Sequence, residues 1–502
     1  MTEQKKTTIK PELAKGFRDI FAADIIARRK MIETIRAVYE KYGFEPLETP
    51  ALEYVEVLGK FLPESDTPEG GIFSTLDSDK SWMALRYDLT ASLSRVVAAN
   101  QQTIPIPFRR YQHGPVWRNE KPGPGRFREF YQFDFDTVGA DSMAADAEAC
   151  ALMGESLEAL GIARGDYVVR VNNRKVLSGL LEKLGVSSEV KPEGFNLELR
   201  VLRSMDKLDR LGFDGVRELL QKGRKDKSGD FTPGAQLDDE KAVLIIDFLK
   251  SEGGSRKEVL GRLRDIVGDS EIGKEGVAEL EEIDACLEAI GVDEKRVIFD
   301  PSAVRGLEYY TGPVFEAVLT FVIKDKKGRT QQFGSVAGGG RYDGLVERFT
   351  GTKLPATGAS IGVDRLLAAL KALGKFTDTD RLGPVVVAVM DQSRMADYLR
   401  MVRDLREAGI RSELYMRDKG LRQQAKYADR RNAPALVIAG GDEFERGEVS
   451  IKDLRLGAML AGKVADNEEW RKAQSAQYSV AQSDLVAEIK KLLEKYQTPE
   501  TP

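Results

Sequence analysis

The chain has 502 residues, of which 42% are hydrophobic and 31% charged, and its formal net charge is −5. This composition is typical of a globular enzyme, and the length predicts roughly three folding units. No apolar run approaches the ~20 residues that cross a bilayer, and the N-terminus has no apolar signal segment. We therefore expect a soluble, cytoplasmic protein that has no membrane contact.

Counts of single residue types exclude several classes of site. The two cysteines, Cys150 and Cys286, cannot build a disulfide framework and suit a reducing compartment. The single histidine, His113, excludes HExxH metalloenzymes and zinc fingers of the Cys/His type. Its basic, aromatic segment favours a structural role. No GxxxxGKS/T phosphate loop is present. The negative charge excludes a general nucleic-acid coat but allows a local basic patch.

The first part of the chain predicts helices on either side of a long hairpin. Apolar spacing, glycines and prolines define these elements. In chain order they are a polar tail (1–10), a helix (24–42), an extended segment (44–50), a hairpin (104–140) broken at KPGPGR (121–126), and a helix (141–163).

The second part predicts an inserted helical module and a separate α/β domain. A stretch rich in Leu, Glu, Lys and Asp covers about 180–298, and strand-like sequence resumes at 297 and at 314–323. After a helix (361–370) and a polar linker, strands at 384–390, 412–415 and 435–438 alternate with helices at 395–408 and 421–431. This order predicts a small parallel sheet with right-handed crossovers.

The hairpin carries the most informative side chains. Alternate residues of a strand share a face, so Arg118 and Glu120 lie together on the first strand. One face of the second strand carries Arg128, Phe130, Gln132, Asp134 and Asp136. This face would suit a ligand with a phosphate, a flat base and an amine. Alternatively, it is a solvated sheet face with cross-strand charge pairs.

Three further segments are weak signals when each is taken alone. VRGLEYYTG (304–312) is compatible with an aromatic sheet edge. The glycines at 338–344 lack the strand and helix of a dinucleotide fingerprint and favour tight turns or close backbone approach. GASIGVDR (358–365) predicts a strand that leads into a helix.

Together, the segments resemble one family. YGFEPLETP (42–50), the hairpin at 108–136 and GASIGVDRL (358–366) resemble the three motifs of class II aminoacyl-tRNA synthetases. LRYDLT (85–90), RGLEYY (305–310) and AGGGRYDGL (337–345) resemble blocks of the histidyl-tRNA synthetases within class IIa. The resemblance covers nearly all of residues 11–500, and the helical insertion is its least specific part.

The resemblance implies an ATP site on the hairpin. Arg118 matches the arginine that grips the α-phosphate, Glu120 the acid near the adenine amino group, and Phe130 the ring that stacks on adenine. Arg126 and Arg365 match the arginines that face the γ-phosphate. A Mg²⁺ ion is expected to accompany the ATP.

Arg118 and Arg305 are the implied catalytic residues. Arg305 matches the arginine on the other side of the α-phosphate, where it also meets the substrate carboxylate. That carboxylate is already ionised near neutral pH and attacks phosphorus directly, so the first step needs no general base. Two guanidinium groups would cancel the phosphate charge and position the reactants.

The resemblance also implies a histidine pocket. Asp88, Thr90 and Gln132 match the positions around the α-amino group. Asp136 and Tyr310 match the pair that reads the imidazole nitrogens, and Tyr309 lines the pocket. Many bacterial members have Glu at the two Asp positions, and the Asp form resembles the eukaryotic type and a subset of bacterial enzymes. A carboxylate of either length can accept from the ring N–H.

The implied protein is an α+β histidine–tRNA ligase that acts as a homodimer. It would activate histidine with ATP to histidyl-adenylate and pyrophosphate, and then transfer histidine to the 3′ end of tRNA(His). We expect a tail (1–10), an antiparallel-sheet catalytic domain (11–375), a linker (376–383) and an α/β anticodon-binding domain (384–500). Between Arg403 and Arg431, Lys and Arg exceed Asp and Glu by four, which suits tRNA contact.

Three alternatives were weighed. A non-catalytic paralogue serves as the regulatory subunit of ATP phosphoribosyltransferase, but such paralogues generally lack the anticodon domain and have eroded catalytic positions. Another class IIa synthetase, for threonine, proline or glycine, is disfavoured by RGLEYY and Asp136. An RNA-binding scaffold would show no ATP dependence.

Overall fold

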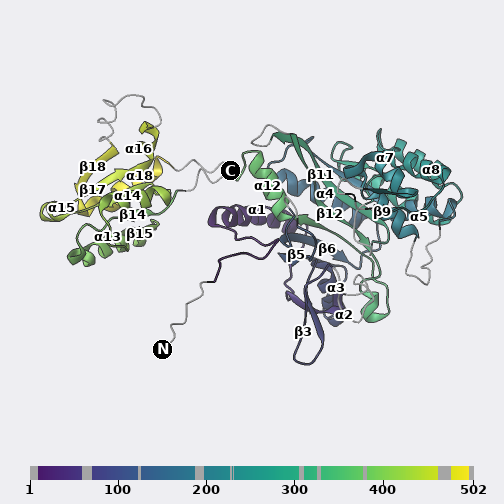
Figure 1. Cartoon of the computed structure of the whole chain (residues 1–502), viewed down its shortest axis with the longest axis horizontal. Coiled ribbons are helices and arrows are strands. Elements are labelled where there is room, and N and C mark those ends of the chain that lie inside the picture. The colour runs from purple at the N-terminus through teal and green to yellow at the C-terminus, as the bar shows by residue number, and fades with distance from the viewer. Residues whose placement is uncertain are drawn as a thin grey trace. The chain divides into compact units, whose positions relative to one another are not determined.

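The structure is a computed structural model. It describes residues 9–58, 71–122, 126–186, 197–225, 229, 231–304, 310–324, 330–376, 382–461 and 476–496. The chain forms two compact units, Met1–Phe376 and Thr377–Pro502 (Figure 1). Within the described ranges, no helix has the length and hydrophobicity that crossing a membrane requires.

The first unit is built on a large mixed sheet. Eight strands of its described residues follow the order β1-β5-β6-β13-β12-β11-β7-β10. The pairs β1–β5 and β7–β10 at the two edges are parallel, and the pairs between them are antiparallel. The strands are β1 (Glu45–Pro46), β5 (Phe108–Trp117), β6 (Glu129–Val138), β7 (Tyr167–Asn173), β10 (Val297–Phe299), β11 (Pro313–Lys324), β12 (Thr330–Tyr342) and β13 (Ala356–Gly362).

One face of this sheet is the hydrophobic core. Helices α1 (Ala22–Lys41), α4 (Ala144–Ala159) and α12 (Val363–Ala372) pack against it or against one another. The ring of Tyr39 from α1 meets the edges of Phe133 and Phe135, with centroids 4.8 and 5.0 Å apart. Because strand side chains alternate, Gln132, Asp134 and Asp136 of β6 must face the opposite side.

A helical module lies at one end of the sheet, in teal in Figure 1. It comprises α5 (Arg174–Lys183), α6 (Leu197–Met205), α7 (Leu208–Leu220), α8 (Asp239–Leu249), α9 (Arg256–Val267), α10 (Glu271–Ala289) and the ribbon β8 (Gly223–Lys225) with β9 (Phe231–Pro233). Helix α10 packs on both α4 and α5. The module and the sheet therefore share one continuous core.

The first unit also contains a smaller, three-stranded sheet. Its order is β2-β4-β3, and both pairs are antiparallel. Its strands and the nearby short helices are β2 (Leu52–Tyr54), β3 (Ser74–Leu76), β4 (Trp82–Leu85), α2 (Val55–Leu58), α3 (Thr90–Ala99) and α11 (Glu347–Thr350). Helix α3 starts directly after Asp88 and Leu89. The carbonyls of Arg86 and Leu89 accept hydrogen bonds from Trp117 and Arg110 of β5, which places the LRYDLT segment beside that strand.

The second unit has a sheet of order β15-β14-β16-β17-β18. Val385 and Val387 pack toward α13 and α18, whereas Val386 packs toward α14, so β14 is buried on both faces. This explains its unbroken apolar sequence. The elements are β14 (Val385–Val387), α13 (Met395–Glu407), β15 (Ser412–Leu414), α14 (Leu421–Arg430), β16 (Ala435–Ile438), α15 (Gly441–Arg446), β17 (Glu448–Asp453), α16 (Leu454–Ala461), β18 (Gln477–Ala481) and α18 (Leu485–Glu494).

The predicted α+β class, long hairpin and helical module are confirmed. The parallel arrangement of β14, β15 and β16 is also as expected. The prediction of a parallel sheet was incomplete, because β17 and β18 add an antiparallel edge that the sequence analysis did not include. The expected domain boundaries stay a prediction, and most of the tail and linker residues lie outside the described ranges.

Two glycines set the distance between α5 and α10. A Cβ on Gly179 would lie 2.5 Å from the Cα of Gly273. We predict that Gly179→Ala forces the helices apart and lowers the free energy of unfolding by roughly 1–3 kcal/mol. The matched control is Gly261→Ala in α9, where a Cβ would meet nothing within 4 Å. It should raise that free energy by about 0.5–1 kcal/mol.

Urea unfolding of the full chain followed by circular dichroism measures both effects. Equal midpoints for Gly179→Ala and Gly261→Ala would contradict the close packing of α5 and α10.

Candidate active site

Strand register builds a polar surface on the face of the sheet opposite the aromatic core. Residues that pair across neighbouring strands point to the same side. Three adjacent rows therefore cross β5, β6, β13 and, for the first two, β12. They are Arg110–Asp136–Gly358–Gly340, Gln112–Asp134–Ser360–Gly338 and Gly114–Gln132–Gly362.

One oxygen of Asp136 accepts a hydrogen bond, and the other forms an ion pair but has no hydrogen-bond partner among the described residues. Its Oδ2 lies 2.7 Å from Nη2 of Arg110, and its Oδ1 accepts a hydrogen bond from the hydroxyl of Tyr342. Arg110 is fully buried and also donates to the carbonyl of Leu89 at 3.1 Å. Burial raises the pKa of Asp136, and the positive charge of Arg110 acts in the opposite direction.

Asp88 is anchored through one oxygen only. Its Oδ1 accepts from the backbone N–H groups of Thr90 at 3.2 Å and Ala91 at 3.0 Å, at the start of α3. Its buried Oδ2 has no hydrogen-bond partner within the described part of the chain, and the same holds for Oε1 of Gln132. Burial raises the pKa of Asp88, opposed by the hydrogen bond from Ala91 and the charge of Arg118. Buried acceptors that lack a partner are costly, so both atoms are suited to a donor from a ligand.

Asp134 is a third buried carboxylate, and the sequence analysis gave it no role. Burial raises the pKa of Asp134 to about 7, with Arg110 lowering it and Asp136 adding to the rise. Oδ1 of Asp134 has no hydrogen-bond partner among the described residues, while a side-chain hydrogen bond with Ser360 lowers the pKa of this carboxyl group. The alternation along β6 already placed this residue on the polar face and was the available signal.

Arg118 and Phe130 lie together on the hairpin. The guanidinium carbon of Arg118 is 5.1 Å from the centroid of the Phe130 ring, and Nε donates to the carbonyl of Tyr87 at 3.2 Å. Glu120 and Arg126 are exposed and form an ion pair of 3.6 Å. An exposed ion pair of this kind contributes little to the stability of the fold. Each of the two side chains can therefore leave its partner and bind a ligand instead.

The positions of three of the remaining five predicted residues are described. Arg365 is exposed in the first turn of α12, and Thr90 is buried at the first position of α3. Tyr310 is half-buried, and its ring lies over Gly340, where a Cβ would approach it to 2.9 Å. Arg305 and Tyr309 fall outside the described residues.

His113 belongs to the core side of the hairpin. Its ring centroid lies 6.0 Å from that of Tyr131 and 5.3 Å from that of Phe133. Burial lowers the pKa of His113. This packing supports the structural role that its sequence context favours.

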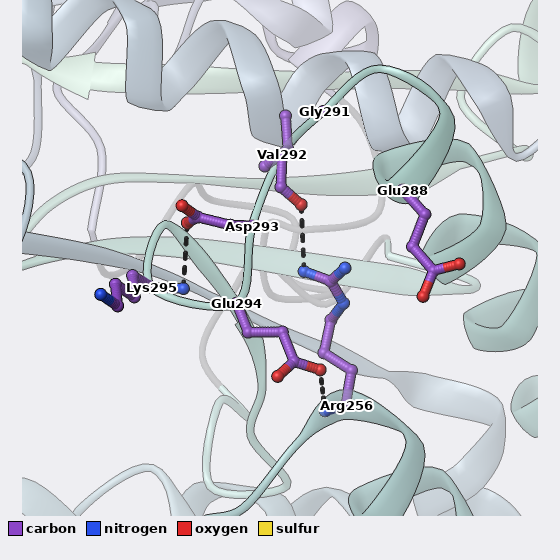
Figure 2. A pocket seen from close by; sticks show the side chains of 7 residues that line it. All are labelled: Arg256, Glu288, Gly291, Val292, Asp293, Glu294 and Lys295. Carbon is purple, nitrogen blue, oxygen red and sulfur yellow. Dashed lines mark hydrogen bonds between the residues drawn. The ribbon is translucent and has the colours of Figure 1, made fainter.

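A depression of about 540 Å³ lies elsewhere, where α9 and α10 meet β10 (Figure 2). Four of its lining residues, Arg256, Glu288, Asp293 and Glu294, already have protein partners for their charged groups. Arg256 pairs with Asp284 and donates to the carbonyls of Val292 and Val297, and Glu294 accepts from the backbone of Arg256. The polar rows, which hold unsatisfied buried acceptors, are therefore the candidate active site.

Comparison with known proteins identifies the family that this arrangement matches. The family model described as histidyl-tRNA synthetase matches residues 16–366, and the anticodon binding domain model matches residues 384–492. A histidine–tRNA ligase of Paracoccus denitrificans is 57% identical over 98% of this chain and 99% of its own. One from Roseobacter denitrificans is 55% identical, with 99% of each chain covered. The crystal structure of histidyl-tRNA synthetase from Nostoc is 32% identical, with a TM-score of 0.66 over 96% of this chain and 100% of that one.

The buried pair of Arg110 and Asp136 generates a stability prediction. Arg110→Met leaves a buried carboxylate without its cation, and we expect a loss of about 3–5 kcal/mol in the free energy of unfolding near neutral pH. Asp136 has a raised pKa in the folded protein, so it binds a proton more readily folded than unfolded. Lowering the pH from about 7 to about 5 should therefore reduce the deficit.

Arg36→Met is the control for this substitution. Arg36 is 41% exposed and pairs with Glu33 and Glu40, and its loss should change stability by at most about 1 kcal/mol. Urea midpoints at several pH values measure both variants. A deficit for Arg110→Met that grows as the pH falls would contradict the assignment.

Proposed function

Because the chain belongs to the histidyl-tRNA synthetase family, we propose that the polar face of its large sheet is where histidine is activated. The chain is an aminoacyl-tRNA ligase that uses ATP to form histidyl-adenylate and then transfers histidine to tRNA. The single observation that carries this function is the identity of 57% to a histidine–tRNA ligase over nearly the whole of both chains.

Two features of the chain disfavour the regulatory-subunit alternative. Residues 384–492 match the anticodon binding domain, which the regulatory paralogues generally lack. Arg118, Arg305 and Arg365 are also all present, whereas such paralogues generally have eroded catalytic positions.

We propose that ATP lies across the hairpin. Arg118, held by the carbonyl of Tyr87, would grip the α-phosphate, and Phe130 beside it would stack on the adenine. Glu120 would meet the adenine amino group, and Arg126 and Arg365 would face the γ-phosphate. The exposure of the last three residues supports this, because a triphosphate must reach them from solvent.

Catalysis in the first step is then a matter of charge and position. The histidine carboxylate attacks the α-phosphorus, and pyrophosphate leaves. Arg118 on one side and Arg305 on the other would neutralise the phosphate oxygens and orient the carboxylate. Mg²⁺ enters as part of the ATP substrate, since it binds phosphate oxygens and keeps several of its waters.

The substrate ammonium group fits the two unsatisfied acceptors. Oδ2 of Asp88 and Oε1 of Gln132 are both buried, and Asp88 is held in place by the start of α3. We propose that these atoms, with Thr90, bind the ammonium, and that Asp136, Tyr309 and Tyr310 form the imidazole pocket. A carboxylate also adds charge to the hydrogen bond and so selects an ammonium over a neutral group.

A homodimer and a cytoplasmic location are further parts of the proposal. Residues 42–50 resemble the dimer-forming motif of class II synthetases. On the neighbouring β2, Leu52 and Tyr54 are 41% and 51% exposed, and a second copy of the chain could cover them. The cysteine content supports a reducing compartment.

We propose that the second unit binds the anticodon arm of tRNA(His). Arg403 and Arg431 are engaged by Asp404 and Glu413. Arg417, Lys419 and Arg422 are instead exposed around Gly420, where α14 begins. Cations on one exposed loop and the adjoining helix can meet successive phosphates.

The activation step is tested by ATP–pyrophosphate exchange without tRNA, with each of the twenty amino acids in turn. Exchange is expected with histidine alone, because polar groups of the pocket would be left unpaired by other side chains. Silence with every amino acid would reject the proposed function and favour the regulatory-subunit alternative.

The tRNA surface is tested by the triple variant Arg417→Ala, Lys419→Ala, Arg422→Ala. We expect the KM for tRNA(His) to rise about tenfold or more. The slope of log KM against the logarithm of the salt concentration should become smaller by about two to three, roughly one for each cation removed. Histidine-dependent exchange should be unchanged. The control is Lys490→Ala, Lys491→Ala, Lys495→Ala, three exposed lysines on or beside α18. An equal effect of both triples would contradict a localised tRNA surface.

A further inference from the structure

The segment that precedes α1 lies across the base of the hairpin. Residues 9–21 contain no helix or strand, yet Gly16 and Phe17 are half-buried. The carbonyl of Gly16 accepts the backbone N–H of Arg128 at 2.9 Å, and the ring centroid of Phe17 lies 5.8 Å from that of Phe73, just before β3. The contact with Arg128 needs a glycine, since Gly16 has φ +89° and a Cβ there would lie 2.8 Å from Cγ of Arg128. This N-terminal segment is therefore attached to the hairpin without secondary structure of its own.

Arg18, in the same segment, connects the hairpin to α12. Its Nη2 lies 2.6 Å from Oδ1 of Asp364, and its guanidinium carbon lies 4.0 Å from the centroid of the Phe127 ring. The other oxygen of Asp364 accepts the backbone N–H of Tyr131 in β6 at 2.8 Å. One guanidinium group thus joins the residues before β6 to the first turn of α12, and Asp364 joins that turn to β6 itself.

The two partners of Arg18 are sequence neighbours of residues that are proposed to bind ATP. Phe127 directly follows Arg126, and Asp364 directly precedes Arg365. Arg126 and Arg365 are the two arginines proposed to face the γ-phosphate. The side chain of Arg126 is 72% exposed and forms an ion pair of 3.6 Å, which contributes little free energy. The position of Arg126 must therefore be set by the backbone beside it.

We propose that Arg18 is a positioning residue for ATP, which holds the backbone beside Arg126 and Arg365 so that both guanidinium groups meet the γ-phosphate. The proposal rests on the proposed function and concerns the terminal phosphate of the nucleotide. Arg18 does not itself touch the nucleotide, because Asp364 and Phe127 already engage its guanidinium group.

This role has a physical basis. Two guanidinium groups that converge on one phosphate repel each other until the ligand is present. When they are held in place beforehand, less side-chain freedom is lost on binding, and the ligand binds more tightly. Arg18 can provide this hold, because a guanidinium pairs with a carboxylate through its edge while its face covers an aromatic ring. Phe127 lies beyond the last pair of the β5–β6 register, Trp117 and Glu129, so the strand ladder does not fix it.

The test is histidine-dependent ATP–pyrophosphate exchange by the full-length chain. Arg18→Met removes the positive charge and keeps an unbranched side chain, and at 36% exposure the position should tolerate it. The KM for ATP should rise about 3- to 30-fold, the combined effect of one exposed ion pair and one exposed cation–π contact. The KM for pyrophosphate should rise as well, because pyrophosphate contains the same terminal phosphate. The KM for histidine should stay within about twofold, since no contact of its pocket is removed.

Two further variants test whether Arg18 acts through Asp364. Arg18→Lys keeps the ion pair but cannot cover the ring of Phe127 at the same time, so it should recover part of the KM for ATP. Asp364→Asn removes the charge that Arg18 binds, while its side-chain oxygen can still accept from Tyr131. Combined with Arg18→Met, it should raise the KM for ATP by less than the product of the two single effects, because both changes remove the same ion pair. A full product, or an Arg18→Lys no better than Arg18→Met, would overturn the proposal.

Arg394→Met is the matched control. Arg394 makes the same two kinds of contact in the second unit, with its guanidinium carbon 4.6 Å from the ring centroid of Phe444 and an ion pair of 3.1 Å to Asp397. It should leave all three KM values within about twofold, since it lies in the other unit of the chain. The same KM for ATP in Arg394→Met and Arg18→Met would contradict a role specific to Arg18.

Failure of this proposal and failure of the proposed function are distinguishable. Wild-type exchange with histidine, together with an unchanged KM for ATP in Arg18→Met, would reject the positioning role alone. An equal rise in the KM values for ATP, pyrophosphate and histidine would indicate a general structural role of Arg18 and would overturn the proposal too. Silence of the wild type with every amino acid would reject the proposed function, and the positioning role with it.

Discussion

The alternation of side chains along β6 is the constraint on which the rest of the catalytic unit depends. Phe133 and Phe135 must face the helices, because their rings pack against Tyr39 of α1. That packing forces Asp134 and Asp136 to the other face, where both are nearly fully buried. A register shift of one residue would exchange the two sets and place carboxylates in the aromatic core. The hydrophobic core and the polar site are therefore held in place by the same strand.

Burying carboxylates requires compensation, and the structure provides it unequally. Charged groups removed from water need a partner of opposite charge or hydrogen-bond donors. Asp136 has Arg110 and Tyr342, while Asp88 has two backbone N–H groups for one oxygen. Burial raises the pKa of all three carboxyl groups, including Asp134. Perturbed carboxyl groups of this kind are common at functional sites, which supports the proposed role of this face in binding the substrate.

The sequence predicts the local part of this arrangement and not the long-range part. Strand alternation grouped Arg118 with Glu120 on the first strand, and Phe130 with Gln132, Asp134 and Asp136 on the second. The role of each residue came from family resemblance, because alternation cannot distinguish a binding face from a solvated one. The pairing of Arg110 with Asp136 depends on the register of β5 against β6, which no local pattern fixes. The sheet of β2, β3 and β4 was missed because strands of three or four residues are too short to show a period.

The glycines show most clearly why the site could not be worked out from sequence. The block at 338–344 suggested tight turns or close backbone approach, and close approach is correct for Gly340. The same close approach at Gly358 was not predicted. Gly338 and Gly362 lie in the same two strands, but a Cβ there would make only ordinary van der Waals contacts, at 3.6 and 3.5 Å. The first pair is required by the protein's own side chains and backbone, whereas the second pair is not. The difference depends on which side chains reach across from β6 and from Tyr310, and only the folded sheet brings them together.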